Sequence, residues 1–326
     1  MITECHTISN ADVTGKEISS MNQSDCTVLV CSCDSYEDAW EPFFKLFHEY
    51  WPDCSLKILL NTESKCFSYP GLNIQCLQKF RKKEPRYGKR MIEHLKMLET
   101  PFTLVLMDDF FLRSPVIDDE LDKVIRWMKK DPKAAVFSFQ PINDELNRPS
   151  NKYEGYDVRP VYGEYKYNFQ AAIWRTDYLL HSWKKHETPW EWETRGNFRS
   201  FNKRYNFYVL NPKKALPLDY GFQNKGMGIF RGKWVKESVV QLFEEHQINV
   251  DYSKRGFYED KDKNIIRMKN RSRISDEFRV VKSYGLQLYV KIFIWRALRQ
   301  LSRCLGNDVP KDYIDFLRKK SKESCK

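Results

Sequence analysis

Several signatures of phosphate and metal sites are missing from this sequence. The first apolar run is followed by DSYED (residues 34–38) and not by Gly-x-Gly-x-x-Gly, and no Gly-Lys-Ser/Thr occurs. These absences exclude the glycine-rich phosphate cradles of dinucleotide-binding folds and P-loop enzymes. No Cys-x-x-Cys or His-x-x-x-His pair is present, so we expect no structural zinc. If a nucleotide binds, its phosphates must be held in another way, by a metal ion.

Long apolar runs are also missing. No stretch approaches the roughly 18 uncharged apolar residues that a membrane-spanning helix needs. Residues 1–25 are polar and contain no apolar core. We therefore expect them to form a disordered lead-in and not a secretory signal.

The nine cysteines do not suggest a disulfide framework. Their number is odd, and several lie in apolar, strand-like segments. This usage predicts buried free thiols in a reducing cytosol.

Positive charge is in excess only at one end of the chain. Residues 261–326 hold 18 Lys and Arg against 7 Asp and Glu, whereas the other 260 residues hold 37 of each sign. A nucleic-acid groove over the body would need a basic face there, so we expect no nucleic-acid partner. The length and charge predict a domain at residues 26–250 and a basic helical extension at 251–326.

Apolar runs and helical periodicities alternate along residues 26–250. This alternation predicts an α/β fold with a mixed, mostly parallel sheet flanked by helices. The glycine-rich residues 220–234 predict a mobile loop. We expect strands at 26–33, 56–61, 72–77, 103–107, 134–139, 167–174 and 206–210, and helices at 39–50, 89–98, 118–130 and 235–246.

Two adjacent carboxylates end the most apolar of these runs. The run at 103–107 reads as a strand buried on both faces, and it stops at Asp108 and Asp109. Open α/β folds bind ligands at the carboxyl ends of such strands. Two neighbouring acids repel each other unless a positive partner joins them, and a divalent ion that bridges phosphates is one such partner. A turn or a helix N-terminus is the alternative reading.

Two further polar clusters are expected near this edge. They are Asp34-Ser35-Tyr36 after the first strand and WEWE at residues 190–193. A metal–diphosphate site with a carboxylate flanked by aromatic rings is what sugar transfer from a nucleotide-sugar requires. The metal neutralises the leaving diphosphate, the carboxylate takes a proton from the acceptor hydroxyl, and the rings support the sugar.

Three motifs together resemble a group of bacterial glycosyltransferases with the GT-A fold. They are the strand ending in DDFFL (108–112), NFQAAIWRTDYLL (168–180) and ETPWEWE (187–193). Members of this group build capsular polysaccharide, exopolysaccharide or O-antigen repeats. The resemblance covers residues 27–246.

The resemblance implies how a nucleotide-sugar donor would be held. Asp109 would contact a divalent ion, Mn²⁺ or Mg²⁺, and Asp108 the ribose or the diphosphate. Arg90 would lie near the donor, although a surface charge is the alternative. The sequence departs from the usual motif, because Met107 and Phe110 stand where further acids occur.

The other two clusters acquire roles in the same way. Asp34, Ser35 and Tyr36 match the segment that holds the nucleotide base, and Glu191 or Glu193 matches the catalytic base of inverting members. The alternatives are a helix cap for Asp34 and solvated loop acids for the two glutamates.

The C-terminal extension contains an amphipathic, basic helix that starts at Leu286, with a second short one at 311–320. It either packs on the body or on a second subunit, or lies on an anionic membrane surface. We therefore interpret the chain as a cytosolic, peripherally membrane-associated glycosyltransferase. It would move a sugar from a nucleotide-sugar to a glycan acceptor, which we expect to be lipid-linked. A sugar nucleotidyltransferase and a non-catalytic glycan-binding or scaffold protein are the alternatives.

Overall fold

The computed structural model describes residues 23–76, 80, 86–161, 163–200, 204–221, 226–259 and 286–305. The expected lead-in up to residue 22 and the expected helix at 311–320 lie outside the described residues. Residues 260–285 of the predicted extension lie outside them as well.

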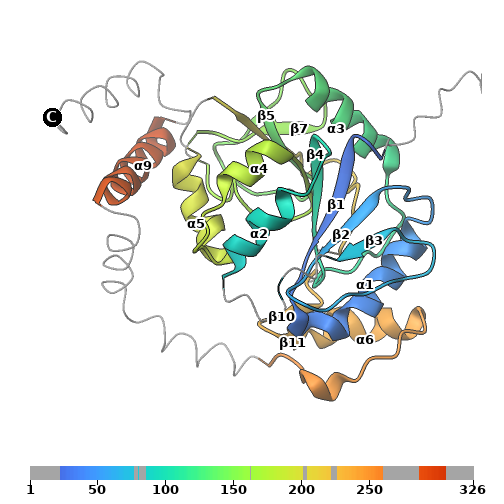
Figure 1. Ribbon diagram of the computed structural model, residues 1–326. Coiled ribbons are helices and arrows are strands. Elements are labelled where there is room, and N and C mark those ends of the chain that lie inside the picture. The colour runs from blue at the N-terminus through green and yellow to red at the C-terminus, as the bar shows by residue number, and fades with distance from the viewer. Residues whose placement is uncertain are drawn as a thin grey trace, which may run out of the picture.

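The described residues build a nine-stranded sheet in the order β3-β2-β1-β4-β8-β5-β9-β7-β6 (Figure 1). It is mixed and mostly parallel, as predicted, and β8 and β7 run against their neighbours. The strands are β1 (Cys26–Cys31), β2 (Lys57–Asn61), β3 (Ile74–Cys76), β4 (Phe102–Met107), β5 (Ala134–Ser138), β6 (Arg148–Pro149), β7 (Tyr156–Val158), β8 (Ala172–Arg175) and β9 (Asn206–Leu210).

Helices cover both faces of the sheet (Figure 1). On one face lie α1 (Glu37–Tyr50), α3 (Asp118–Lys130) and α6 (Lys236–Glu245). On the other lie α2 (Tyr87–Leu95), α4 (Thr176–Ser182) and α5 (Pro189–Arg199). The predicted α/β class is therefore confirmed.

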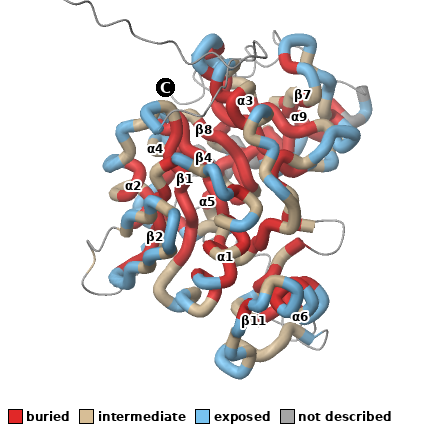
Figure 2. The backbone as a smooth tube through the Cα atoms, turned by 90° about the vertical axis from the view of Figure 1, so that its right-hand side faces the viewer, coloured by how far each residue is buried: buried red, intermediate tan, exposed pale blue. Residues whose placement is uncertain are grey.

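The central strand β4 is buried because its side chains alternate between the two cores. Leu104 and Leu106 join the core on the α1 face, and Val105 joins the core on the α2 face. Burial on both sides explains why its sequence is continuously apolar. Nearly all residues of β1 and β4 are buried, and both strands are coloured red in Figure 2.

The register of the sheet collects several loops at one edge. Cys31, the last residue of β1, pairs with Asn61 of β2 and with Met107 of β4. The segments that follow these parallel strands therefore start side by side. Because β8 is antiparallel to β4, its first residue Ala172 pairs with Val105, so the residues before it, Gln170 and Ala171, approach the same edge.

One alternative and one local prediction are wrong. The alternative that the WEWE glutamates are loop acids is wrong because the segment starts α5, where Thr188 and Glu191 form a capping box and Pro189 occupies the first turn. Within the glycine-rich tract, the described residues 226–234 contain a hairpin of β10 (Ile229–Phe230) and β11 (Lys233–Trp234).

The C-terminal helix α9 (Leu286–Leu305) packs against α5. Trp295, Leu298 and Ser302 are buried on its inner side, and Arg299 forms ion pairs with Asp144 and Glu164. Packing on the body, one of the two alternatives for this helix, is thus what the structure has. Within the described residues, no helix has the length and apolar character needed to cross a membrane.

Candidate active site

Asp108 is a buried acid anchored to the end of β1. Its side chain accepts a hydrogen bond from the Ser32 hydroxyl, and the Trp40 Nε1–H donates to the same hydroxyl over 2.7 Å. Only 2% of Asp108 is exposed. Burial, together with the neighbouring charge of Asp109, holds the pKa of Asp108 well above its usual range. A positive partner would therefore stabilise its ionised form.

Asp109 presents an unsatisfied oxygen beside Asp108. Its Oδ1 atom is buried and has no hydrogen-bond partner among the described residues. Burial raises the pKa of this carboxyl group to about 7. Its backbone carbonyl is fixed by the Gly228 N–H at 2.7 Å, which attaches the β10–β11 hairpin to the site.

These two acids fit a divalent cation. A buried, unpaired carboxylate oxygen is costly, and coordination of a cation removes the cost. Among the described residues, no group of three or more His, Cys, Asp and Glu is placed to hold a metal. A cation at Asp108 and Asp109 would therefore take its remaining ligands from water or from phosphate oxygens, as Mg²⁺ commonly does.

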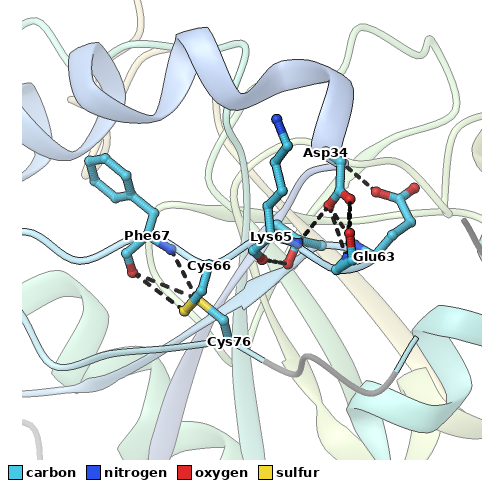
Figure 3. Close-up of a disulfide and its surroundings, with 8 residues drawn as sticks. Asp34, Glu63, Lys65, Cys66, Phe67 and Cys76 are labelled. Atoms are coloured by element: carbon cyan, nitrogen blue, oxygen red, sulfur yellow. Dashed lines mark hydrogen bonds between the residues drawn. A yellow bond between two sulfur atoms is a disulfide. The ribbon is translucent and has the colours of Figure 1, made fainter. Parts of the chain in front are cut away.

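Asp34 is used to organise the loop after β2 (Figure 3). Its carboxylate accepts backbone N–H groups of Glu63, Ser64 and Lys65 at 3.0, 3.1 and 3.2 Å, and the Ser64 hydroxyl at 2.6 Å. Partial burial opposes the charge, but these hydrogen bonds together lower the pKa of Asp34. The helix-cap alternative is wrong, since Cys33 holds the cap position of the 3₁₀ turn Asp34–Tyr36.

The same loop is closed by a disulfide between Cys66 and Cys76 (Figure 3). The prediction that the cysteines are free thiols is therefore wrong for this pair. It holds for Cys26 and Cys31, which are free and buried, whereas Cys33 and Cys54 are free and half-buried and Cys304 is free and exposed. The pairing was not predictable because nine cysteines offer many partners, and this bond depends on β2 and β3 lying side by side. A disulfide also weighs against a strictly reducing compartment.

Arg90 is buried and links two loops, so it is not a surface charge. Its guanidinium pairs with Glu63, donates to the Ser32 carbonyl over 2.7 Å and lies 4.9 Å from the Tyr87 ring centre. Only 1% of it is exposed. Glu63 in turn accepts the Asp34 N–H at 2.6 Å, so Arg90 holds together the loops that follow β1 and β2.

Ser35 and Tyr36 lie closer to open space. Ser35 is exposed and Tyr36 is half-buried. Burial raises the pKa of Tyr36, and the negative charges of Asp109 and Asp108 add to the rise. Tyr36 is therefore close enough to both acids to belong to the same site.

The two candidate bases on α5 have different surroundings. Glu191 is engaged in the capping box with Thr188 and pairs with Arg195 at 2.9 Å. Although partial burial opposes it, these contacts lower the pKa of Glu191. Glu193 accepts the Phe169 N–H at 2.9 Å, the one hydrogen bond of its carboxylate among the described residues, and burial raises its pKa. Because Phe169 lies just before β8, this bond brings Glu193 toward the edge that carries Asp108. A raised pKa suits a general base, so of the two glutamates Glu193 is the better candidate.

One residue was missed, and Gln170, inside the 168–180 motif, was left open between a site role and sheet packing. Gln170 has a buried Oε1 without a partner among the described residues. Arg255 lies over the Tyr36 ring at 4.4 Å, and its charge partly offsets the rise that burial causes in the pKa of Asp108 and of Asp109. Nothing in the sequence marked Arg255, which falls in the segment interpreted as an irregular extension.

No protein-family model and no curated protein sequence matches the chain. Solved structures with a similar fold include S. aureus TarS 1–349 at 13% identity, where the match covers 57% of this chain and 60% of that chain with a TM-score of 0.37. The same protein in complex with UDP-GlcNAc matches over 82% and 78% at 12% identity and a TM-score of 0.38. For the mannosyltransferase PcManGT from Pyrobaculum calidifontis, in complex with GDP-Man and Mn²⁺, the match covers 90% of this chain and 83% of that chain at 12% identity, with a TM-score of 0.38. Similarity this low does not transfer function, so the residues of the site must support it themselves.

Proposed function

We propose that the chain is a glycosyltransferase that moves a sugar from a nucleotide-sugar to a glycan acceptor. Two observations carry the proposal: one buried oxygen of the Asp108–Asp109 pair has no partner among the described residues, and the half-buried Glu193, whose pKa burial raises, is hydrogen-bonded to the segment that enters β8 at the same sheet edge. The first feature suits a cation-bound diphosphate, and the second suits proton removal from an acceptor hydroxyl.

In the proposed reaction, Glu193 takes the proton of the acceptor hydroxyl as its oxygen bonds to the anomeric carbon of the donor sugar. The bond from that carbon to the diphosphate breaks, and its electron pair leaves with the diphosphate oxygen. Asp109, with Asp108 beside it, would hold Mn²⁺ or Mg²⁺, which when bound neutralises this leaving group. The Phe169 N–H orients the Glu193 carboxylate through Oε1 and leaves its other oxygen for the proton.

The nucleoside is proposed to bind at the end of β1. Ser35 is exposed there, and the Tyr36 ring is next to the two acids. Asp34 and Arg90 both bind Glu63 of the 62–65 loop and so hold this loop against the end of β1. Neither side chain needs to touch the donor.

The acceptor is proposed to bind beside α5. Trp190 is 73% exposed and lies three residues before Glu193, hence on nearly the same side of the helix. Such a ring can support the apolar face of a sugar. We propose a lipid-linked glycan of a bacterial surface polysaccharide as the acceptor.

An anionic membrane surface is the proposed partner of α9. Val290, Phe293, Ala297 and Leu301 recur at three- and four-residue spacing and are exposed, on the side away from Trp295 and Ser302. The helix sequence has four Lys and Arg and no Asp or Glu. An apolar stripe on a helix without acids complements negatively charged lipid head groups.

This attachment is tested by sedimentation with vesicles of phosphatidylglycerol and phosphatidylcholine. Phe293→Ser with Leu301→Ser should reduce binding, and Gln300→Ser, at an exposed polar position on the same helix, should not. Binding that is equal for all three chains, or that needs no anionic lipid, would rule out this surface.

The enzymatic proposal is tested by assays of donor hydrolysis and sugar transfer with a panel of nucleotide-sugars and Mn²⁺ or Mg²⁺. Asp109→Ala and Glu193→Ala should abolish turnover, whereas Asp119→Ala, at an exposed position in α3, should leave it intact. If neither of the first two variants differs from the wild-type chain with any donor, the proposal fails.

A further inference from the structure

A segment beyond the predicted catalytic domain reaches the acid pair. The chain turns at the 3₁₀ helix Tyr252–Lys254 and then runs beside β11, where the Trp234 N–H donates to Gly256 over 3.0 Å and the Tyr258 N–H donates to Trp234 over 2.8 Å. The hairpin that carries Trp234 is itself attached to the Asp109 carbonyl through Gly228. The position of Arg255 is thus set by the same hairpin that contacts Asp109.

The Arg255 guanidinium is held rigidly. It forms a two-point pair with Asp38, with Nε donating to Oδ2 over 2.7 Å, and it donates to the Ser35 carbonyl over 2.8 Å. It also stacks on Tyr36, with Trp234 5.7 Å away. Its side chain is only 8% exposed. A buried two-point pair of this kind fixes orientation as well as charge.

One edge of this guanidinium is still available. Nε and Nη2 are occupied by Asp38 and Ser35, but within the described part of the chain Nη1 makes a single long hydrogen bond, to the Gly232 carbonyl at 3.4 Å. Such a long bond is weak. An anionic oxygen that approaches from the side of Tyr36 and the acids would gain a charge-assisted hydrogen bond.

We propose that Arg255 binds the diphosphate of the donor and stabilises the charge that the leaving nucleoside diphosphate acquires. This inference rests on the proposed function and adds a residue to it. As the bond between the anomeric carbon and the diphosphate oxygen breaks, the electron pair stays on that oxygen, and the fixed guanidinium meets it without rearrangement. Arg255 supplies positive charge at an edge where the described acids supply at most two cation ligands.

The proposal is tested by calorimetric titration of UDP, GDP, UMP and GMP in the presence of Mn²⁺. Arg255→Gln should weaken binding of the preferred diphosphate roughly 10- to 100-fold, the usual scale of a lost charged hydrogen bond. Binding of the matching monophosphate should change much less. Arg231→Gln, at an exposed position on the hairpin turn, removes an equal charge nearby and should leave both affinities unchanged.

Removal of Arg255 alone leaves Asp38 without its partner, so loss of folding has to be separated from loss of binding. The double variant Arg255→Gln with Asp38→Asn leaves no unpaired charge. It should show the same selective loss of diphosphate binding, and without ligand it should melt at the same temperature as the wild-type chain. Equal weakening of diphosphate and monophosphate in both variants would assign Arg255 a structural role and overturn the inference alone. A wild-type chain that binds no nucleoside diphosphate would overturn the proposed function with it.

Discussion

The two glutamates of α5 provide a matched test, because they are two residues apart and differ in surroundings. Glu193→Gln keeps an amide oxygen that can accept the Phe169 N–H, so the local fold should persist. It removes the ability to take a proton. Loss of a general base lowers kcat roughly 100- to 10,000-fold, which corresponds to about 2.7–5.4 kcal/mol in the activation free energy.

Glu191→Gln is the control. Glutamine is also accepted at this position of a capping box, so the contacts with Thr188 should survive. The lost pair with Arg195 is partly exposed and should cost only about 0.3–0.5 kcal/mol of stability. We expect kcat to stay within about twofold of the wild-type value.

The assay measures sugar transfer against pH with a saturating donor. A base must be deprotonated to act, and burial raises the pKa of Glu193, so kcat should fall as the pH drops through that raised value. The variant Glu193→Gln should lack this limb. An equal loss in Glu191→Gln, or a pH profile that is the same with and without Glu193, would refute the assignment.

Three further substitutions test the supporting structure. Cys76→Ser opens the disulfide beside the 62–65 loop, so the free energy of unfolding should fall by about 3 kcal/mol for a loop of this length, and the melting temperature should fall with it. Nucleoside diphosphate affinity measured by calorimetry should also drop, and Cys54→Ser should change neither stability nor affinity. Trp190→Ala should raise the KM for the glycan acceptor several-fold and leave donor hydrolysis intact, and equal effects on both would contradict a platform role. Gly228→Ala places a Cβ against the Phe111 ring and should lower both stability and diphosphate affinity. Gly232→Ala is strained at its φ of +80° and should lower stability, but its Cβ meets open space, so it should affect affinity little.

The sheet and the acid pair could be predicted because their signals are local. The apolar run of β4 records burial on both faces, and Asp108 and Asp109 mark the point where that burial ends. The capping box of α5 was also written locally, as Thr188 three residues before Glu191, and it could have separated the two glutamates from the sequence.

The remaining parts of the site depend on contacts between distant segments. Arg255 meets Asp38 across 217 residues, and only the path of the β10–β11 hairpin brings them together. For Arg90 the sequence left a place near the donor and a surface charge open, because its partner Glu63 follows another strand. The boundary expected at residue 250 follows a change in composition. Composition cannot show that the chain after this point folds back and places Arg255 beside the site of Asp108 and Asp109.

The central claim is that Asp108 and Asp109 form a cation-dependent site for a nucleotide-sugar. Thermal unfolding of the wild-type chain and of Asp109→Asn, with a panel of nucleotide-sugars and with or without Mn²⁺, tests it most directly. A ligand at 100 times its Kd should stabilise the wild-type chain by about 2.7 kcal/mol when Mn²⁺ is present. We predict that one class of nucleotide-sugar raises the melting temperature only with the metal, and that Asp109→Asn loses this rise. A melting temperature that no nucleotide-sugar changes, or an equal rise in Asp109→Asn, would contradict the claim.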